Sequence, residues 1–130
     1  LMLGALVLSA FLVAACSESS GTANTPPCNL PPVESSPTCT AFCAQVIGNC
    51  TAFGTTEECC RRGCQKNVDD EYAQADVCGE AVDDTFLCVS ELEDCQAVRD
   101  WRDQDPRDGF PCRDSVLVID ALIADGTCLP

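Results

Sequence analysis

Cysteine content is the feature that most constrains the fold of this chain. Of the 130 residues, 13 are cysteine and none is histidine. So high a fraction in a short chain is typical of small exported domains held by disulfide bridges, because their apolar cores are too small to offset chain entropy alone. The lack of histidine removes the commonest general base and metal ligand, which excludes histidine-dependent triads and zinc sites.

Charge narrows the possible partners. Asp and Glu outnumber Lys and Arg by 21 to 7, and the first charged residue is Glu18. A field of this sign repels phosphate backbones, so we expect no nucleic-acid partner. Calcium or a basic protein is electrostatically allowed, although solubility alone would account for the excess of acid.

Residues 1–15 form an uncharged apolar run, LMLGALVLSAFLVAA. The run is shorter than the roughly 20 residues needed to span a bilayer, and it fits the apolar core and small-residue end of a signal peptide. The usual basic start is missing and the first residue is Leu rather than Met. We therefore expect either a truncated N-terminus or a misassigned start.

The end of the signal peptide and the residue after it form a short motif, Val13-Ala14-Ala15-Cys16, which resembles the lipobox of bacterial lipoproteins. The resemblance implies a lipid on the Cys16 sulfur, removal of residues 1–15, and acyl chains (palmitate among them) that anchor the protein to the membrane. Two or more acyl chains give stable anchoring. Ser17 in place of Asp implies the outer membrane of a Gram-negative bacterium. The alternative is ordinary cleavage after Ala15, leaving Cys16 free or disulfide-bonded.

Cysteine parity agrees with lipidation, since removing Cys16 from 13 leaves an even number for bridges. Residues 16–38 then form a Ser- and Pro-rich tether, whose proline pairs at 26–27 and 31–32 favour extended backbone. Cys28 lies within this tether. We expect it to pin the second half of the tether to the domain by a disulfide, with a bond to another chain as the alternative.

Residues 39–130 predict an all-α, disulfide-rich bundle of four to five short helices. Apolar residues and cysteines recur at three- and four-residue steps from Cys39 to Cys50, after a helix start at Pro37-Thr38 and up to an end near Gly48-Asn49. Thr55 and Glu58 fit a capping box for a second helix.

Three further helices are predicted. The third spans 70–91 with the apolar stripe Val77, Cys78, Ala81, Val82, Phe86, Val89 and Leu92. A short fourth helix runs through Cys95, Val98 and Trp101, and a turn-rich loop follows at 103–111. The last, 115–125, is expected to be the buried central helix; a strand and an exposed partner surface are the alternatives.

Cys39-x3-Cys43 and Cys60-x3-Cys64 on successive helices resemble the α-hairpinin arrangement, in which two helices are stapled antiparallel. The resemblance implies the pairs Cys39–Cys64 and Cys43–Cys60. Two further cysteines depart from a simple hairpin and indicate a third bridge nearby, Cys50 and Cys59. The remaining cysteines are expected to pair among themselves without an assignable order: Cys28, Cys78, Cys88, Cys95, Cys112 and Cys128. Zinc is disfavoured because no CxxC knuckle is present.

The 103–114 loop faintly resembles a calcium-binding EF-hand loop. Its candidate ligands are Asp103, Asp105, Asp108 and Asp114. Arg107 and Pro106 interrupt the pattern, so a solvated acidic loop is the favoured interpretation.

No residue set points to catalysis, and no cofactor is expected. Adjacent acids at 69–70, 83–84 and 93–94 fit a solvated helix surface, and Trp101 and Phe110 fit core packing better than a binding patch. The sequence therefore predicts a non-enzymatic, membrane-anchored extracytoplasmic lipoprotein that serves as a structural or binding scaffold for an unidentified protein or glycan. A calcium-binding surface module and an inhibitor- or toxin-like scaffold are the alternatives.

Overall fold

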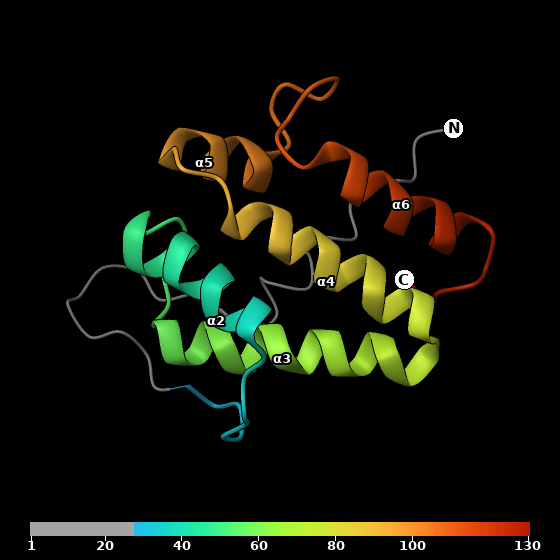
Figure 1. Ribbon diagram of the computed structural model, residues 1–130, viewed down its shortest axis with the longest axis horizontal. Coiled ribbons are helices and arrows are strands. Elements are labelled where there is room, and N and C mark those ends of the chain that lie inside the picture. Colours follow the sequence, from blue (N-terminus) through green and yellow to red (C-terminus); the bar gives the residue numbers. More distant parts are fainter. Residues whose placement is uncertain (1–27) are drawn as a thin grey trace.

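The computed structural model describes residues 28–130 as a small bundle of helices, with no strand in that part of the chain (Figure 1). The predicted all-α, disulfide-rich class is confirmed. The predicted signal peptide, Cys16 and the tether up to residue 27 lie outside the described residues. The elements in chain order are α2 (Pro37–Cys43), the π-helix η1 (Ala44–Asn49), α3 (Glu57–Gln74), α4 (Asp76–Ser90), α5 (Cys95–Asp103) and α6 (Arg113–Ala124).

Helix α4 is the central element of the bundle. Helices α2, α3 and α6 all pack against it, and α3 and α4 lie side by side as an antiparallel pair (Figure 1). Helix α5 contacts η1. None of the helices in residues 28–130 has the length and apolar character to cross a bilayer.

Helix α2 starts where the sequence predicts. The Ser36 hydroxyl accepts a hydrogen bond from the Cys39 amide at 3.2 Å, and Pro37 occupies the first turn, where its missing N–H costs nothing. The chain then widens into η1, in which the Cys50 amide donates to the Gln45 carbonyl at 3.0 Å, five residues back. The predicted end at Gly48-Asn49 matches the end of η1.

The cap of α3 differs from the prediction. The Thr56 hydroxyl, not that of Thr55, accepts the Cys59 amide at 3.1 Å. Thr56 has the extended backbone that an N-cap needs, so Glu58 falls too early in the helix to complete a capping box and pairs with Arg62 instead. Glu57 and Glu58 both lie in the first turn, as the favourable interaction with the helix dipole predicts.

The predicted third helix over 70–91 is wrong at its start. Residues 70–74 form the last part of α3. The helix is interrupted at Ala75, whose backbone is extended with φ −162° and ψ 150°. Beyond the break, Gly79 has no side chain, and the Tyr72 ring occupies the space that a Cβ would take. The turn between α3 and α4 is thus accompanied by a contact between Tyr72 and Gly79, which the spacing of apolar residues in the sequence does not predict.

The core lies where α2, α4 and α5 meet. Phe42 is fully buried, with its ring centroid 4.5 Å from that of Phe86 and 5.8 Å from that of Trp101 in an edge-on arrangement. Val89 and Val98 are also fully buried beside them. Trp101 and Phe110 belong to this core, in agreement with the interpretation favoured from the sequence.

The last helix is confirmed as a helix, but its predicted central burial is wrong. Val116 and Ile119 are buried, whereas Leu117 and Val118 are 41% and 51% exposed. Helix α6 is therefore an outer, amphipathic helix that covers one side of α4. Val77 on α4 is likewise 41% exposed, so it lies off the buried stripe predicted for that helix.

Candidate functional site

All twelve cysteines of residues 28–130 form disulfides with one another. Two bridges join the facing sides of α2 and α3, and two others join α4 to the chain at either end of α6. The pairs are Cys28–Cys59, Cys39–Cys64, Cys43–Cys60, Cys50–Cys95, Cys78–Cys128 and Cys88–Cys112. The two hairpin pairs implied by the α-hairpinin resemblance are present. The prediction that the remaining six cysteines pair among themselves is wrong, because Cys28 bonds to Cys59 and Cys95 bonds to Cys50.

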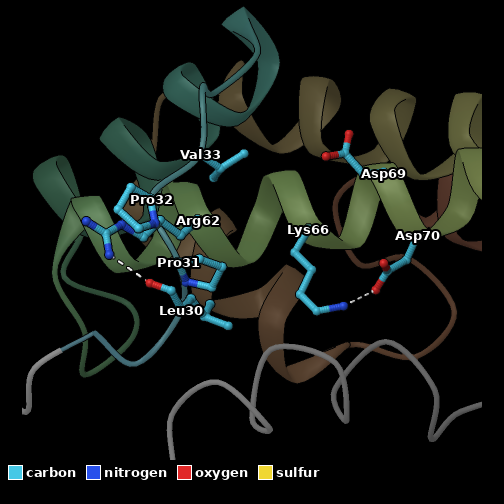
Figure 2. A pocket seen from close by; sticks show the side chains of 8 residues that line it. All are labelled: Leu30, Pro31, Pro32, Val33, Arg62, Lys66, Asp69 and Asp70. Atoms are coloured by element: carbon cyan, nitrogen blue, oxygen red, sulfur yellow. Dashed lines mark hydrogen bonds and ion pairs between the residues drawn. The ribbon is translucent and has the colours of Figure 1, made fainter.

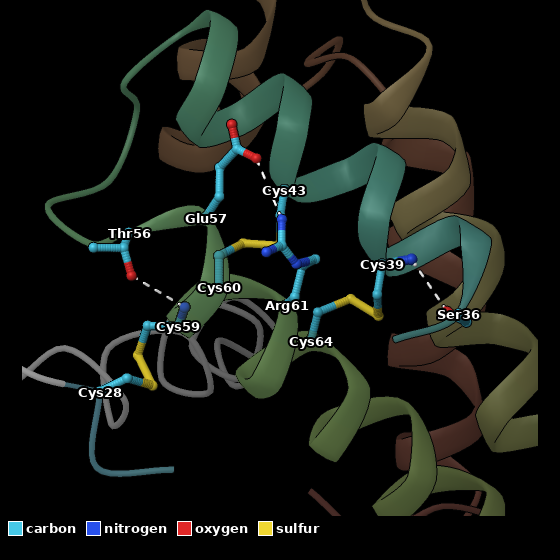
Figure 3. The surroundings of a disulfide bond; sticks show 10 residues. All are labelled: Cys28, Ser36, Cys39, Cys43, Thr56, Glu57, Cys59, Cys60, Arg61 and Cys64. Carbon is cyan, nitrogen blue, oxygen red and sulfur yellow. Dashed lines mark hydrogen bonds and ion pairs between the residues drawn. A yellow bond between two sulfur atoms is a disulfide. The ribbon is translucent and has the colours of Figure 1, made fainter. Parts of the chain in front are cut away.

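The tether is attached to the domain from Cys28 onward. Cys28 bonds to Cys59 in the first turn of α3, beside the two hairpin bridges (Figure 3). The Leu30 carbonyl accepts a hydrogen bond from Arg62 at 2.7 Å, and the Ser36 amide donates to Gln65 at 2.7 Å. This part of the tether therefore runs along α3 rather than hanging free.

A hollow of about 310 Å³ lies between this segment and α3 (Figure 2). Its apolar side comes from residues 30–33. Its charged side comes from α3, where Lys66 pairs with Asp70, and Arg62 pairs with Glu58 and holds the Leu30 carbonyl. Because its cations are satisfied by the protein itself, this hollow offers an incoming anion no free partner.

The four calcium candidates do not converge. Asp103 is held by Arg102 at 2.8 Å, and that guanidinium lowers the pKa of the Asp103 carboxyl. Asp105, Asp108 and Asp114 are exposed, and nowhere in residues 28–130 do three potential metal ligands gather. The calcium-binding alternative thus rests on the sequence pattern alone.

A long acidic segment covers α4 and its flanks. Residues 67–98 contain no lysine or arginine. Within this segment Tyr72 is 41% exposed, and burial together with the carboxylates of α4 raises its pKa. The acidic residues of the segment are Asp69, Asp70, Glu71, Asp76, Glu80, Asp83, Asp84, Glu91, Glu93 and Asp94.

A second hollow, of about 140 Å³, lies between the 104–113 loop and α6. Sequence reasoning missed it. Among the residues that line it, Phe110 and Val116 are buried and Leu117 is exposed. Its charged lining residues are Arg107, Arg113 and Asp120. The available signal was the spacing on α6, where Arg113 and Asp120 are seven residues apart and so share a face across the apolar pair 116–117.

Two carboxyl groups have raised pKa values because of burial. Glu71, near the end of α3, is 8% exposed, and burial followed by the nearby Asp70 charge raises its pKa. Burial alone raises the pKa of Asp120 on α6. Glu71 accepts a hydrogen bond from Gln74 at 3.1 Å, whereas Asp120 accepts none from residues 28–130.

Comparisons with protein-family models, with curated proteins and with solved structures found no match for this chain. Functional interpretation therefore rests on the sequence and the geometry described above.

Proposed function

We propose that this chain is the precursor of a membrane-anchored extracytoplasmic lipoprotein whose domain is a non-enzymatic, disulfide-stapled scaffold. One observation carries the proposal. The twelve cysteines after residue 27 pair among themselves, so none of them is left as a partner for Cys16, the cysteine of the lipobox-like motif. A cysteine left outside a complete set of bridges needs another role, and the lipobox-like motif around Cys16 supplies one.

The redox requirement supports export. Six bridges persist only in an oxidising compartment, because cytosolic thiol systems reduce such bonds. A leader at 1–15 would deliver the chain to that compartment, and the outer membrane of a Gram-negative bacterium is the address that Ser17 implies.

The acidic segment 67–98 supports a binding role at the cell surface. A segment that carries many carboxylates and no basic residue of its own attracts cationic groups and repels anionic ones. The proposed partner is a protein or glycan rather than a nucleic acid. A non-enzymatic role is supported by the lack of histidine in the chain and by a sequence that offers no nucleophile with its base.

The decisive experiment expresses the full chain behind a start codon in a Gram-negative host, with labelled palmitate and intact mass measurement. We expect label in the membrane fraction and a mature chain that starts at Cys16 with acyl mass added. Cys16→Ser is the matched control, and it should lose the label while the other twelve cysteines are unchanged. Release of an unlabelled chain cut after Ala15 would contradict the anchor.

The scaffold part is tested separately by alkylating the intact protein without reductant. We expect no modified thiol in residues 28–130. Several modified cysteines, with a bound metal in the native mass, would contradict the disulfide scaffold and return attention to metal or redox chemistry.

A further inference from the structure

Three basic residues of the described chain lack an acidic partner. Arg61, Arg62, Lys66 and Arg102 form ion pairs. Within residues 28–130, no carboxylate oxygen lies within 4.0 Å of a side-chain nitrogen of Arg99, Arg107 or Arg113. Two of these three, Arg107 and Arg113, line the same hollow. They lack an ion pair although the chain contains 21 acidic residues.

The opposite charge in the same hollow is also unpaired. Asp120 lines the hollow, is half-buried and accepts no hydrogen bond or ion pair from residues 28–130. The Arg113 Nε donates a hydrogen bond to the Arg107 backbone carbonyl at 3.1 Å, so the two arginines that line the hollow are in direct contact. Solvent still reaches the Asp120 carboxylate, because no buried side-chain oxygen in residues 28–130 lacks a hydrogen-bond partner, so a cationic group of a ligand can approach it.

An apolar trough separates the two charged ends. Arg113 and Asp120 lie seven residues apart on α6, about 10 Å along its axis. Val116 and Leu117 lie between them, and Phe110 comes from the facing loop. The hollow of about 140 Å³ is smaller than a site for a drug-sized ligand, which restricts it to a short, slender molecule.

We propose that this hollow binds a linear ω-amino acid group, in which a carboxylate and an ammonium are joined by a short methylene chain. The carboxylate binds Arg107 and Arg113, the methylene chain lies on Phe110, Val116 and Leu117, and the ammonium binds Asp120. Charge-assisted bonds at both ends satisfy three groups that the protein leaves unpaired. A free ω-amino acid and a lysine at the C-terminus of a protein both present this chemistry.

The test titrates 6-aminohexanoate into the full chain, purified with its bridges intact, and follows backbone amide signals by NMR. We expect saturable shifts at Arg107, Leu117 and Asp120. Hexanoate, which lacks the ammonium, and pentylamine, which lacks the carboxylate, should each bind at least tenfold more weakly. Equal binding of all three compounds, or no saturable shift with 6-aminohexanoate, would overturn the proposal.

Variants assign the two ends. Arg107→Gln and Asp120→Asn should each weaken 6-aminohexanoate binding at least tenfold, while far-UV circular dichroism checks that both variants stay folded. Arg99→Gln and Asp114→Asn are the matched controls, because Arg99 is equally unpaired and Asp114 is on the same helix, yet neither lines the hollow. Equal weakening by the control variants would overturn the assignment.

The source of the ligand is settled by two peptides. An acetylated tripeptide ending in lysine with a free carboxylate is compared with the same peptide amidated at its C-terminus. Binding of the free-acid peptide alone supports a protein C-terminus as the ligand, whereas failure of both beside binding of 6-aminohexanoate supports a small ω-amino acid. Binding of the amidated peptide as tightly as the free acid would overturn the role of the two arginines.

Discussion

The α2–α3 hairpin and the α4–α6 pair are each held by two disulfides, but the bridges are placed differently. In the hairpin, Cys39–Cys64 and Cys43–Cys60 join helix to helix through buried sulfurs, so the bridges are part of the core. In the second region, Cys112 caps the start of α6 and Cys128 follows its end, so the bonds to α4 fix the ends of α6. The end-fixed helix α6 keeps apolar side chains exposed, Leu117 and Val118, whereas the bridged faces of α2 and α3 are buried.

The largest expected effect comes from full reduction, which removes both kinds of attachment. Each bridge typically contributes about 2–4 kcal/mol, and whole domains are stable by only about 5–15 kcal/mol. We therefore expect excess reductant to abolish cooperative thermal unfolding, as followed by circular dichroism at 222 nm. A reduced chain that stayed helical and melted cooperatively would show that the apolar core suffices in both regions.

Phe42→Ala contrasts the buried core of the first region with the exposed face of the second. Phe42 is fully buried against two aromatic rings, so we expect its loss to cost about 3–5 kcal/mol in denaturant unfolding. Leu117→Ala, at a residue 41% exposed, should change stability by less than about 1 kcal/mol. Similar losses of unfolding free energy for the two variants would mean that Leu117 is buried in the core, in contradiction to its exposure.

Removing one bridge from each region sharpens the contrast between them. Cys78→Ala with Cys128→Ala should cost about 2–4 kcal/mol, with faster hydrogen exchange confined to the C-terminal half of α6 and the turn after it. The matched pair Cys39→Ala with Cys64→Ala should instead speed exchange across α2, α3 and α4, since α2 packs on both other helices. Faster hydrogen exchange throughout the domain after loss of Cys78–Cys128 would contradict the idea that this bridge only fixes the end of α6.

The smallest expected effect is on the pH dependence of stability. Each region contains one carboxyl group whose pKa is raised by burial. Burial raises the pKa of Glu71 and of Asp120, so the folded state binds a proton more tightly than the unfolded state. Stability contributed by these groups is therefore present at low pH and lost as pH rises through the window just above the ordinary carboxyl pKa. Glu71→Gln and Asp120→Asn should each flatten the pH dependence of the free energy of denaturant unfolding between pH 4 and 7.

Periodicity and turn residues predicted the helical class, the start of α2, the short α5 and the helical state of α6. These features depend on local sequence, such as Pro37 and the apolar spacing in each segment. The break at Ala75 was not predicted because no glycine or proline marks it, and the Tyr72–Gly79 contact that accompanies it lies between helices. The exposure of α6 was missed for a related reason, since an apolar segment does not reveal which helix takes the central place.

The site was harder to predict than the fold. Sequence reasoning singled out Asp103, Asp105, Asp108 and Asp114 because calcium loops have a known spacing, and the structure leaves these carboxylates apart. Arg107, Arg113 and Asp120 carry no such pattern. What distinguishes them is the lack of partners for their charges, which only a three-dimensional arrangement can show.

The Cys28–Cys59 bridge has a mechanical consequence for a chain anchored at residue 16 as proposed. Because the bond attaches the tether to the first turn of α3, a pull from the membrane side reaches the domain through sulfur and bypasses the hydrogen bonds of residues 29–36. Tyr72 lies 13 residues further along α3 than Cys59, so it stands roughly 20 Å from this point of attachment. With residue 16 as the anchor, a pull therefore enters the domain at Cys59, at the opposite end of α3 from Tyr72.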